Sequence, residues 1–161
     1  MVTKKGWLDY LYYNVGQQQF DFRLNSLSRQ PDGSCKSSKW KKYSELIFPI
    51  DYNEDWKIKN INNREILPNE VVIDLEEKES LQKVLEKIKS FKVPYYVWDT
   101  HSRGFHIHIF LDRILSVEEK LWVIKECGGD IQKANNGTTI ALENAEHWKS
   151  GKKTELLLNG N

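Results

Sequence analysis

The sequence predicts an α+β fold: an RRM-like module with the element order β-α-β-β-α-β, preceded by a small α/β N-terminal lobe. From residue 67 onward, apolar residues alternate in some segments and recur at helical spacing in others, in that order. In addition, 39% of the 161 residues are hydrophobic and 12% are aromatic, which is enough for one folded core. We therefore expect a single domain over residues 1–161, with a first lobe over about 1–66 and a second over about 67–161.

Four elements are predicted in the first lobe. Residues 3–15 predict a short amphipathic helix, because apolar side chains recur there at helical spacing. Residues 19–24 alternate and predict a strand. Residues 29–42 are rich in Pro, Gly, Ser and Lys and predict a basic loop or hairpin turn. Residues 43–50 predict a strand or a short apolar stretch that ends near Pro49.

The second lobe begins with an apolar strand over residues 71–76. A helix follows and ends before Pro94, which cannot continue it. Strands are then predicted over residues 95–98 and 105–111. The apolar face of the helix is formed by Leu81, Val84, Leu85 and Ile88.

A second helix is predicted from its two ends. Ser116-Val117-Glu118-Glu119 has the sequence of a capping box, and Gly128 is typical of a helix end. Residues 138–142 and 154–158 predict the closing strands of the lobe.

Two of these strands carry ionisable residues at alternate positions. Asp74 and Glu76 share one face of the first strand, and His106 and His108 share one face of another. Burying such groups is costly unless something binds them. Two carboxylates on one face are suited to a two-metal phosphoryl-transfer site, and Mg²⁺ or Mn²⁺ prefers these oxygen ligands. The alternative is a strand that ends at a sheet edge with solvated acids.

Two further segments have the composition of phosphate-binding elements. In the turn from Ser102 to His106, Arg103 offers bidentate contacts and Gly104 permits close backbone approach. The alternative for this turn is a hairpin with an exposed arginine and a core histidine. The segment from Glu146 to Lys153 gathers a histidine, three lysines and a glycine, and its alternative is a basic surface turn.

In combination and in this order, these motifs resemble the archaeo-eukaryotic primase superfamily. The shared pattern is an hhhDhE strand, an S-x-G-x-H turn, a later Asp and an H-x-K-[ST]-G element, over residues 67–155. The resemblance implies a minimal catalytic core in which Asp74, Glu76 and Asp130 are the catalytic metal ligands. Glu143 and Glu155 remain alternatives to Asp130. It assigns nucleotide binding to Ser102, Arg103, His106, His147 and Lys149.

The activity implied by the resemblance is template-directed nucleotidyl transfer by a DNA primase or primase-polymerase with a two-metal Mg²⁺ or Mn²⁺ site. The partners implied are nucleoside triphosphates, a single-stranded DNA template, and a helicase or another replication subunit. Structural zinc is not expected, because Cys35 and Cys127 lie far apart and form no CxxC pair.

Two other functions remain open. His106-Ile107-His108 is also the His-hydrophobic-His signature of replication initiators and relaxases, in which a tyrosine attacks DNA. No tyrosine follows Tyr96, so only a nucleophile near the N-terminus, namely Tyr10, Tyr12 or Tyr13, fits that class. The second alternative is a nucleic-acid-binding subunit without activity, either on an RRM-like fold or as an inactive primase-like protein.

Charge and hydropathy limit the partners. The net charge is +1, so an anionic partner must be bound by a local basic patch. No signal-peptide segment and no apolar run of membrane-spanning length occurs in the sequence. We expect a cytoplasmic protein that does not bind membranes.

Overall fold

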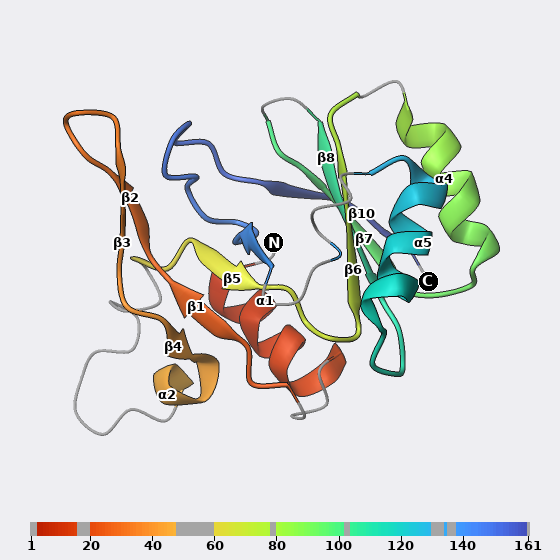
Figure 1. The fold of residues 1–161 in the computed structure, drawn as a ribbon, viewed down its shortest axis with the longest axis horizontal. Coiled ribbons are helices and arrows are strands. Elements are labelled where there is room, and N and C mark those ends of the chain that lie inside the picture. Colours follow the sequence, from red (N-terminus) through yellow and green to blue (C-terminus); the bar gives the residue numbers. More distant parts are fainter. Residues whose placement is uncertain are drawn as a thin grey trace. The chain divides into compact units, whose positions relative to one another are not determined.

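The chain forms two compact units, each described here by itself (Figure 1). This computed structural model describes residues 3–15, 20–47, 60–77, 80–101, 104–129, 134 and 138–160. The first unit comprises residues 1–65 and 139–153, and the second comprises residues 66–138 and 154–161. The change from the first unit to the second at residue 66 lies where the sequence suggested a lobe boundary. Residues 139–153, however, belong to the first unit and not to the second lobe.

The first unit is built on a four-stranded antiparallel sheet and a separate hairpin. The order in the sheet is β4-β1-β5-β9, and β2 pairs with β3. The predicted N-terminal helix is present as an α-helix followed by a π-helix. The bounds are α1 Lys4–Asp9, η1 Tyr10–Val15, β1 Arg23–Asn25, β2 Leu27–Arg29, β3 Cys35–Ser37, β4 Lys41–Lys42, α2 Tyr43–Ile47, β5 Asn63–Glu65 and β9 Thr139–Ala141.

Residues 43–50 were predicted as a strand or a short apolar stretch, and the strand alternative is wrong for the described part, because α2 occupies Tyr43–Ile47. Tyr43 and Leu46 are both buried, and their spacing of three residues is helical. The ring of Tyr43 stacks on Phe22 at 5.3 Å, and its hydroxyl bonds to Asp9. A five-residue segment is too short for its period to distinguish a helix from a strand. Residues 48–50 lie outside the described part.

The second unit has the predicted element order. Its antiparallel sheet has the order β10-β7-β8-β6. Because β6 and β7 both run antiparallel to β8 between them, β6, α4 and β7 form a split βαβ unit. The α+β class is thus confirmed. The RRM-like arrangement is not confirmed, since the first strand of this unit lies at the sheet edge. The bounds are β6 Glu70–Leu75, α4 Leu81–Ser90, β7 Tyr95–Asp99, β8 Phe105–Phe110, α5 Val117–Cys127 and β10 Glu155–Gly160.

Both helices of the second unit cover the same face of its sheet (Figure 1). Their apolar residues pack against every second residue of β6, β7 and β8 to form the core. The predicted signals at the ends of α5 are confirmed: Ser116 and Glu119 form the capping box, and Gly128 ends the helix with φ +74°. Core residues contributed by the strands are Val71, Ile73, Leu75, Tyr95, Val97, Phe105, Ile107 and Ile109.

The opposite face of this sheet carries the polar residues of the strands. Strand alternation places Glu70 and Asp74 of β6 there, together with His106 and His108 of β8. Trp98 of β7 shares the face and pairs with His106. The helices therefore fix the backbone that positions these side chains, while the side chains themselves project away from the helical layer.

Candidate functional site

Asp74 and His106 are directly opposite each other on neighbouring strands. The register of β6 and β8 pairs them, and Asp74 Oδ1 lies 3.6 Å from His106 Nε2. The side chain of Asp74 is 30% exposed and that of His106 is 15% exposed. A carboxylate and an imidazole thus share a partly solvent-accessible position near the end of the strand pair, where an ion or a phosphate group has access to both.

His108 lies in a different environment, although it shares its face with His106. Its Nδ1 is 2.6 Å from Glu70 Oε2, and both side chains are fully buried. The other oxygen of Glu70 accepts a bond from the Leu67 N–H at 3.0 Å. Lys120 donates to the Leu67 carbonyl at 3.0 Å, and burial lowers the pKa of this lysine. His108 therefore belongs to a buried polar network at the start of β6.

Glu76 follows the last residue of β6 and is exposed. Together with Asp74 it supplies carboxylate oxygens at the end of one strand, and this donor type fits Mg²⁺ or Mn²⁺. The described residues contain no cluster of three or more His, Cys, Asp or Glu side chains arranged to hold a metal ion. The third predicted ligand, Asp130, lies outside the described part, as do Ser102 and Arg103.

Gly104 brings the start of β8 against the end of the acidic strand. A Cβ atom at this position would lie 1.8 Å from the carbonyl oxygen of Leu75 and 3.0 Å from the Cα of Glu76. The Thr100 hydroxyl donates to the Gly104 carbonyl at 2.8 Å, which fixes the turn from the other side. The glycine of the S-x-G-x-H motif is thus required for close backbone approach beside Asp74 and Glu76.

Gly104→Ala is expected to destabilise the protein by about 1–3 kcal/mol, because the new methyl group overlaps backbone atoms that have little room to move. Urea denaturation of both proteins measures this difference. Gly33→Ala is the control: Gly33 has φ +86° and open space around it, so only backbone strain of about 1 kcal/mol is expected there. A Gly104→Ala protein as stable as the wild type would contradict the close approach.

Gly129 also packs against the acidic strand. A Cβ atom there would lie 3.0 Å from Ile73 Cγ2 and 3.5 Å from the backbone nitrogen of Asp74. Its N–H donates to the carbonyl of Ile124 at 3.0 Å, in the last turns of α5. The end of α5 therefore returns the chain to the middle of β6 immediately before position 130.

The H-x-K-[ST]-G element forms a compact turn in the first unit. His147 Nδ1 accepts bonds from the N–H groups of Lys149 at 3.1 Å and Ser150 at 3.4 Å. The Gly151 N–H donates to the His147 carbonyl at 2.8 Å, and Gly151 has φ +71°. Because Nδ1 accepts, a neutral His147 carries its proton on Nε2 and offers one N–H donor. Burial and nearby Lys149 lower the pKa of His147, which favours this neutral form.

The turn is expected to loosen as the pH falls. Protonated Nδ1 cannot accept the two backbone bonds, and the folded pKa of His147 lies below its ordinary value of 6.5. Its contribution is therefore complete above pH 6.5 and declines as the pH falls from there through the folded pKa. In urea denaturation above pH 6.5, His147→Ala should cost about 1 kcal/mol. His147→Asn should cost less, because the Asn oxygen can accept the same bonds. Equal losses in both variants at every pH would contradict this role.

The alternatives to Asp130 have structural partners. Glu143 is fully buried in the first unit, where Arg64 Nε donates to it at 2.9 Å and the Trp7 indole also donates to it. Glu155 is exposed on β10 and lies 2.9 Å from His101 Nε2. Glu143 therefore stabilises the core of its unit and is not available to an ion at the end of β6.

The tyrosines required by the relaxase hypothesis belong to an aromatic cluster in the first unit. Tyr10 stacks on Trp7 at 5.7 Å, and Tyr12 packs edge-on against Tyr43 at 5.6 Å. Tyr13 is the most exposed of the three candidates and packs edge-on against Tyr12. The packing of this cluster accounts for these aromatic residues without a catalytic role.

No protein-family model matches this chain, and no curated protein matches it in sequence. The primase resemblance thus rests on the sequence motifs alone. Within the described residues, no helix has both the length and the apolar character needed to cross a membrane.

Two polar pairs in the structure were not predicted from the sequence: Glu70–His108 and Arg64–Glu143. Glu70 occupies the same face of β6 as Asp74, four residues earlier, so alternation alone could have linked it to the histidine strand. The Arg64–Glu143 pair joins β5 to the segment after β9, and its members are 79 residues apart. Such a pair has no local signal in the sequence.

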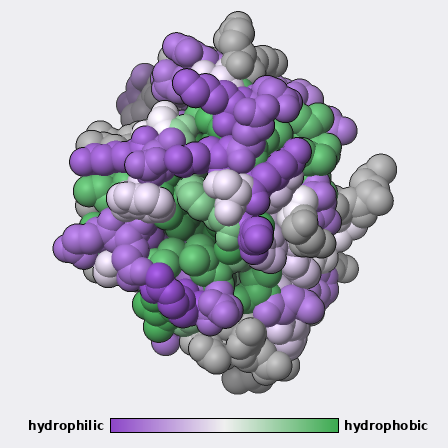
Figure 2. Space-filling view, turned by 90° about the vertical axis from the view of Figure 1, so that its right-hand side faces the viewer, coloured by the Kyte–Doolittle hydropathy of each residue, from purple (hydrophilic) through white to green (hydrophobic). Residues whose placement is uncertain are grey.

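The second unit also has an apolar area on the side that α4 and α5 cover. Figure 2 faces this side and shows hydrophobic residues bordered by hydrophilic ones. Trp122 is exposed and lines a cavity of about 330 Å³ between α5 and the end of β8. The cavity lies on the helical side of the sheet, opposite Asp74 and His106, and the two titratable residues that line it, Arg113 and Glu119, form an ion pair with each other. It is lined by Phe91, Val93, Ile109, Leu111, Arg113, Leu115, Glu119, Trp122 and Val123.

Proposed function

We propose that the protein is a template-directed nucleotidyltransferase of the primase-polymerase type. The observation that carries this proposal is the pairing of Asp74 with His106 across β6 and β8, with Glu76 two residues farther along the acidic strand. An acidic group for cations and an imidazole for phosphate oxygens then occur side by side. That combination is what phosphoryl transfer needs, because its catalysis is mostly positioning and charge stabilisation.

Asp74 and Glu76 are the residues that would hold Mg²⁺ or Mn²⁺, with Asp130 as the third proposed ligand. When bound, such ions lower the pKa of an attacking hydroxyl and neutralise charge on a leaving pyrophosphate. Partial burial of Asp74 strengthens its interaction with a cation relative to a fully solvated carboxylate. Gly104 keeps the histidine strand against this end of β6, so the spacing between the carboxylates and His106 is set by the backbone.

The proposed role of His106 is to bind phosphate. Its Nε2 lies 3.6 Å from Asp74 Oδ1, and an imidazole N–H can donate to an anionic phosphate oxygen. His147 and Lys149 are proposed to bind phosphates through one neutral N–H donor and one ammonium group, and the H-x-K-[ST]-G turn positions both. Ser102 and Arg103 complete the proposed nucleotide-binding set.

The experiment that tests the proposal combines a single-stranded DNA template, labelled nucleoside triphosphates and Mn²⁺ or Mg²⁺. Elongated labelled products resolved by gel electrophoresis, and lost on addition of EDTA, are the expected result. Ribo- and deoxynucleotides are supplied in separate reactions, with and without an annealed primer. Absence of any product under all these conditions would contradict the proposal.

A further inference from the structure

The β2–β3 hairpin and the residues on either side of it form a strongly basic segment of the first unit. Residues 23–42 contain six Lys or Arg and one acid, Asp32, whereas the whole chain has a net charge of only +1. All six cationic side chains are exposed. They are Arg23, Arg29, Lys36, Lys39, Lys41 and Lys42. This segment therefore has five more cationic than acidic residues (six against one), whereas the whole chain has a net charge of +1. Such a local concentration of positive charge is suited to binding a polyanion.

An aromatic side chain lies among these cations. Trp40 is 39% exposed, and the guanidinium of Arg23 lies 5.6 Å from the centre of its ring. Arg23 is itself held by Glu65 at 2.8 Å. The tryptophan thus has one contact that restrains it and an exposed surface on which a base can stack.

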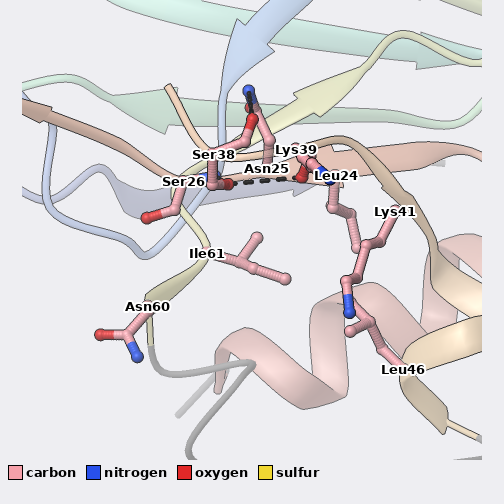
Figure 3. Close-up of a pocket in the computed structure, with 9 residues that line it drawn as sticks. All are labelled: Leu24, Asn25, Ser26, Ser38, Lys39, Lys41, Leu46, Asn60 and Ile61. Atoms are coloured by element: carbon pink, nitrogen blue, oxygen red, sulfur yellow. Dashed lines mark hydrogen bonds between the residues drawn. The ribbon is translucent and has the colours of Figure 1, made fainter. Parts of the chain in front are cut away.

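A pocket opens beside the same segment (Figure 3). Its volume is about 340 Å³, and Leu24, Leu46 and Ile61 form its apolar part. Lys39 and Lys41 line it from the basic segment. The side chain of Asn25 also lines the pocket and is oriented by a 2.9 Å bond from Asn63. An apolar pocket with an amide on its wall and lysines beside it matches a nucleobase attached to a phosphate backbone.

We infer that this basic segment of the first unit, with Trp40 and the pocket beside it, binds single-stranded DNA. The phosphates contact the lysines of residues 36–42, one base stacks on Trp40, and a neighbouring base enters the pocket lined by Leu24, Ile61 and Asn25. The choice of DNA as the occupant rests on the proposed function, in which a DNA template is copied. The binding segment itself is argued from charge, the exposed ring and the pocket.

Fluorescence anisotropy with a labelled oligodeoxythymidine of about 12 nucleotides, within the range of one single-strand site, tests this inference. Lys39→Gln with Lys41→Gln should weaken binding and reduce the slope of log K against log salt by about 1.4, since each phosphate contact contributes about 0.7. Trp40→Ala should weaken binding about 5- to 100-fold. The matched control is Lys83→Gln with Lys89→Gln, the same charge change on exposed positions of α4, and it should bind like the wild type.

Two further oligomers complete the design. An abasic oligomer of equal length should bind the wild type more weakly and should be insensitive to Trp40→Ala, because it has no base to stack. An RNA oligomer should bind no better than DNA. Equal loss in the α4 control, no effect of Trp40→Ala on thymidine binding, or a preference for RNA would overturn the inference. Nucleotide incorporation is measured separately. If the wild-type protein polymerises while the Lys39→Gln/Lys41→Gln and Trp40→Ala variants bind DNA normally, this inference alone is refuted.

Discussion

Asp74→Asn is expected to lower metal-dependent nucleotide incorporation by about a thousandfold. The substitution keeps the size of the side chain but removes the charge that would hold a cation, and metal-based stabilisation of the transition state amounts to several kcal/mol. Because Asp74 is only half-buried and lies at the edge strand of its sheet, the variant should fold normally. Initial rates with primed template and Mn²⁺, together with circular dichroism of both proteins, give the comparison.

Asp112→Asn is the matched control for this prediction. Asp112 is an exposed acid just after β8 in the same unit, and it has no proposed role at the site. Its loss should leave incorporation unchanged. Incorporation by Asp74→Asn at the wild-type rate would show that β6 does not carry the catalytic cation.

Glu143→Leu is expected to destabilise the protein by about 3–5 kcal/mol, because it leaves the guanidinium of Arg64 buried without its carboxylate. Both side chains are almost completely inaccessible, and three contacts of 2.9, 3.2 and 3.3 Å join them. The indole N–H of Trp7 loses its acceptor in the same variant. Urea denaturation monitored by tryptophan fluorescence measures the change in the free energy of unfolding.

Two comparisons isolate the buried charge as the cause. Glu65→Gln removes one partner of the exposed Arg23–Glu65 pair and should cost less than about 1 kcal/mol. The double variant Arg64→Met with Glu143→Leu should recover much of the stability lost in Glu143→Leu, because no uncompensated charge remains. If the double variant is less stable than Glu143→Leu, then Arg64 stabilises the fold even without its carboxylate, and an uncompensated buried charge is not the cause of the loss.

The sequence was most informative where an element is long and its period is clear. The helix around Leu85 and the helix that begins at Ser116 were predicted closely, because each has a full apolar face or a complete capping box. The short segment at Tyr43 was predicted as a strand or a short apolar stretch and is a helix. Five residues do not contain enough turns for periodicity to decide between the two structures.

Long-range pairing accounts for most of what the sequence did not predict. The strand at residues 139–141 was expected, but its partner is β5 of the first unit, and no local pattern specifies that choice. The same limit applies to the candidate site. Alternation placed Asp74 and His106 on faces of their own strands, whereas the register that sets them opposite each other became apparent only in the assembled sheet. The assembled sheet also gives the two histidines different partners: His108 bonds to Glu70, whereas His106 faces Asp74.

Template-directed incorporation is the most direct test of the proposed function. Homopolymeric single-stranded DNA templates, each annealed to a short primer, are supplied with one labelled nucleotide at a time in the presence of Mn²⁺. The wild-type protein should add the nucleotide complementary to each template and discriminate against the other three, and Asp74→Asn should add it about a thousandfold more slowly. Incorporation that is independent of the template, or equal for the four nucleotides, would contradict a template-directed nucleotidyltransferase.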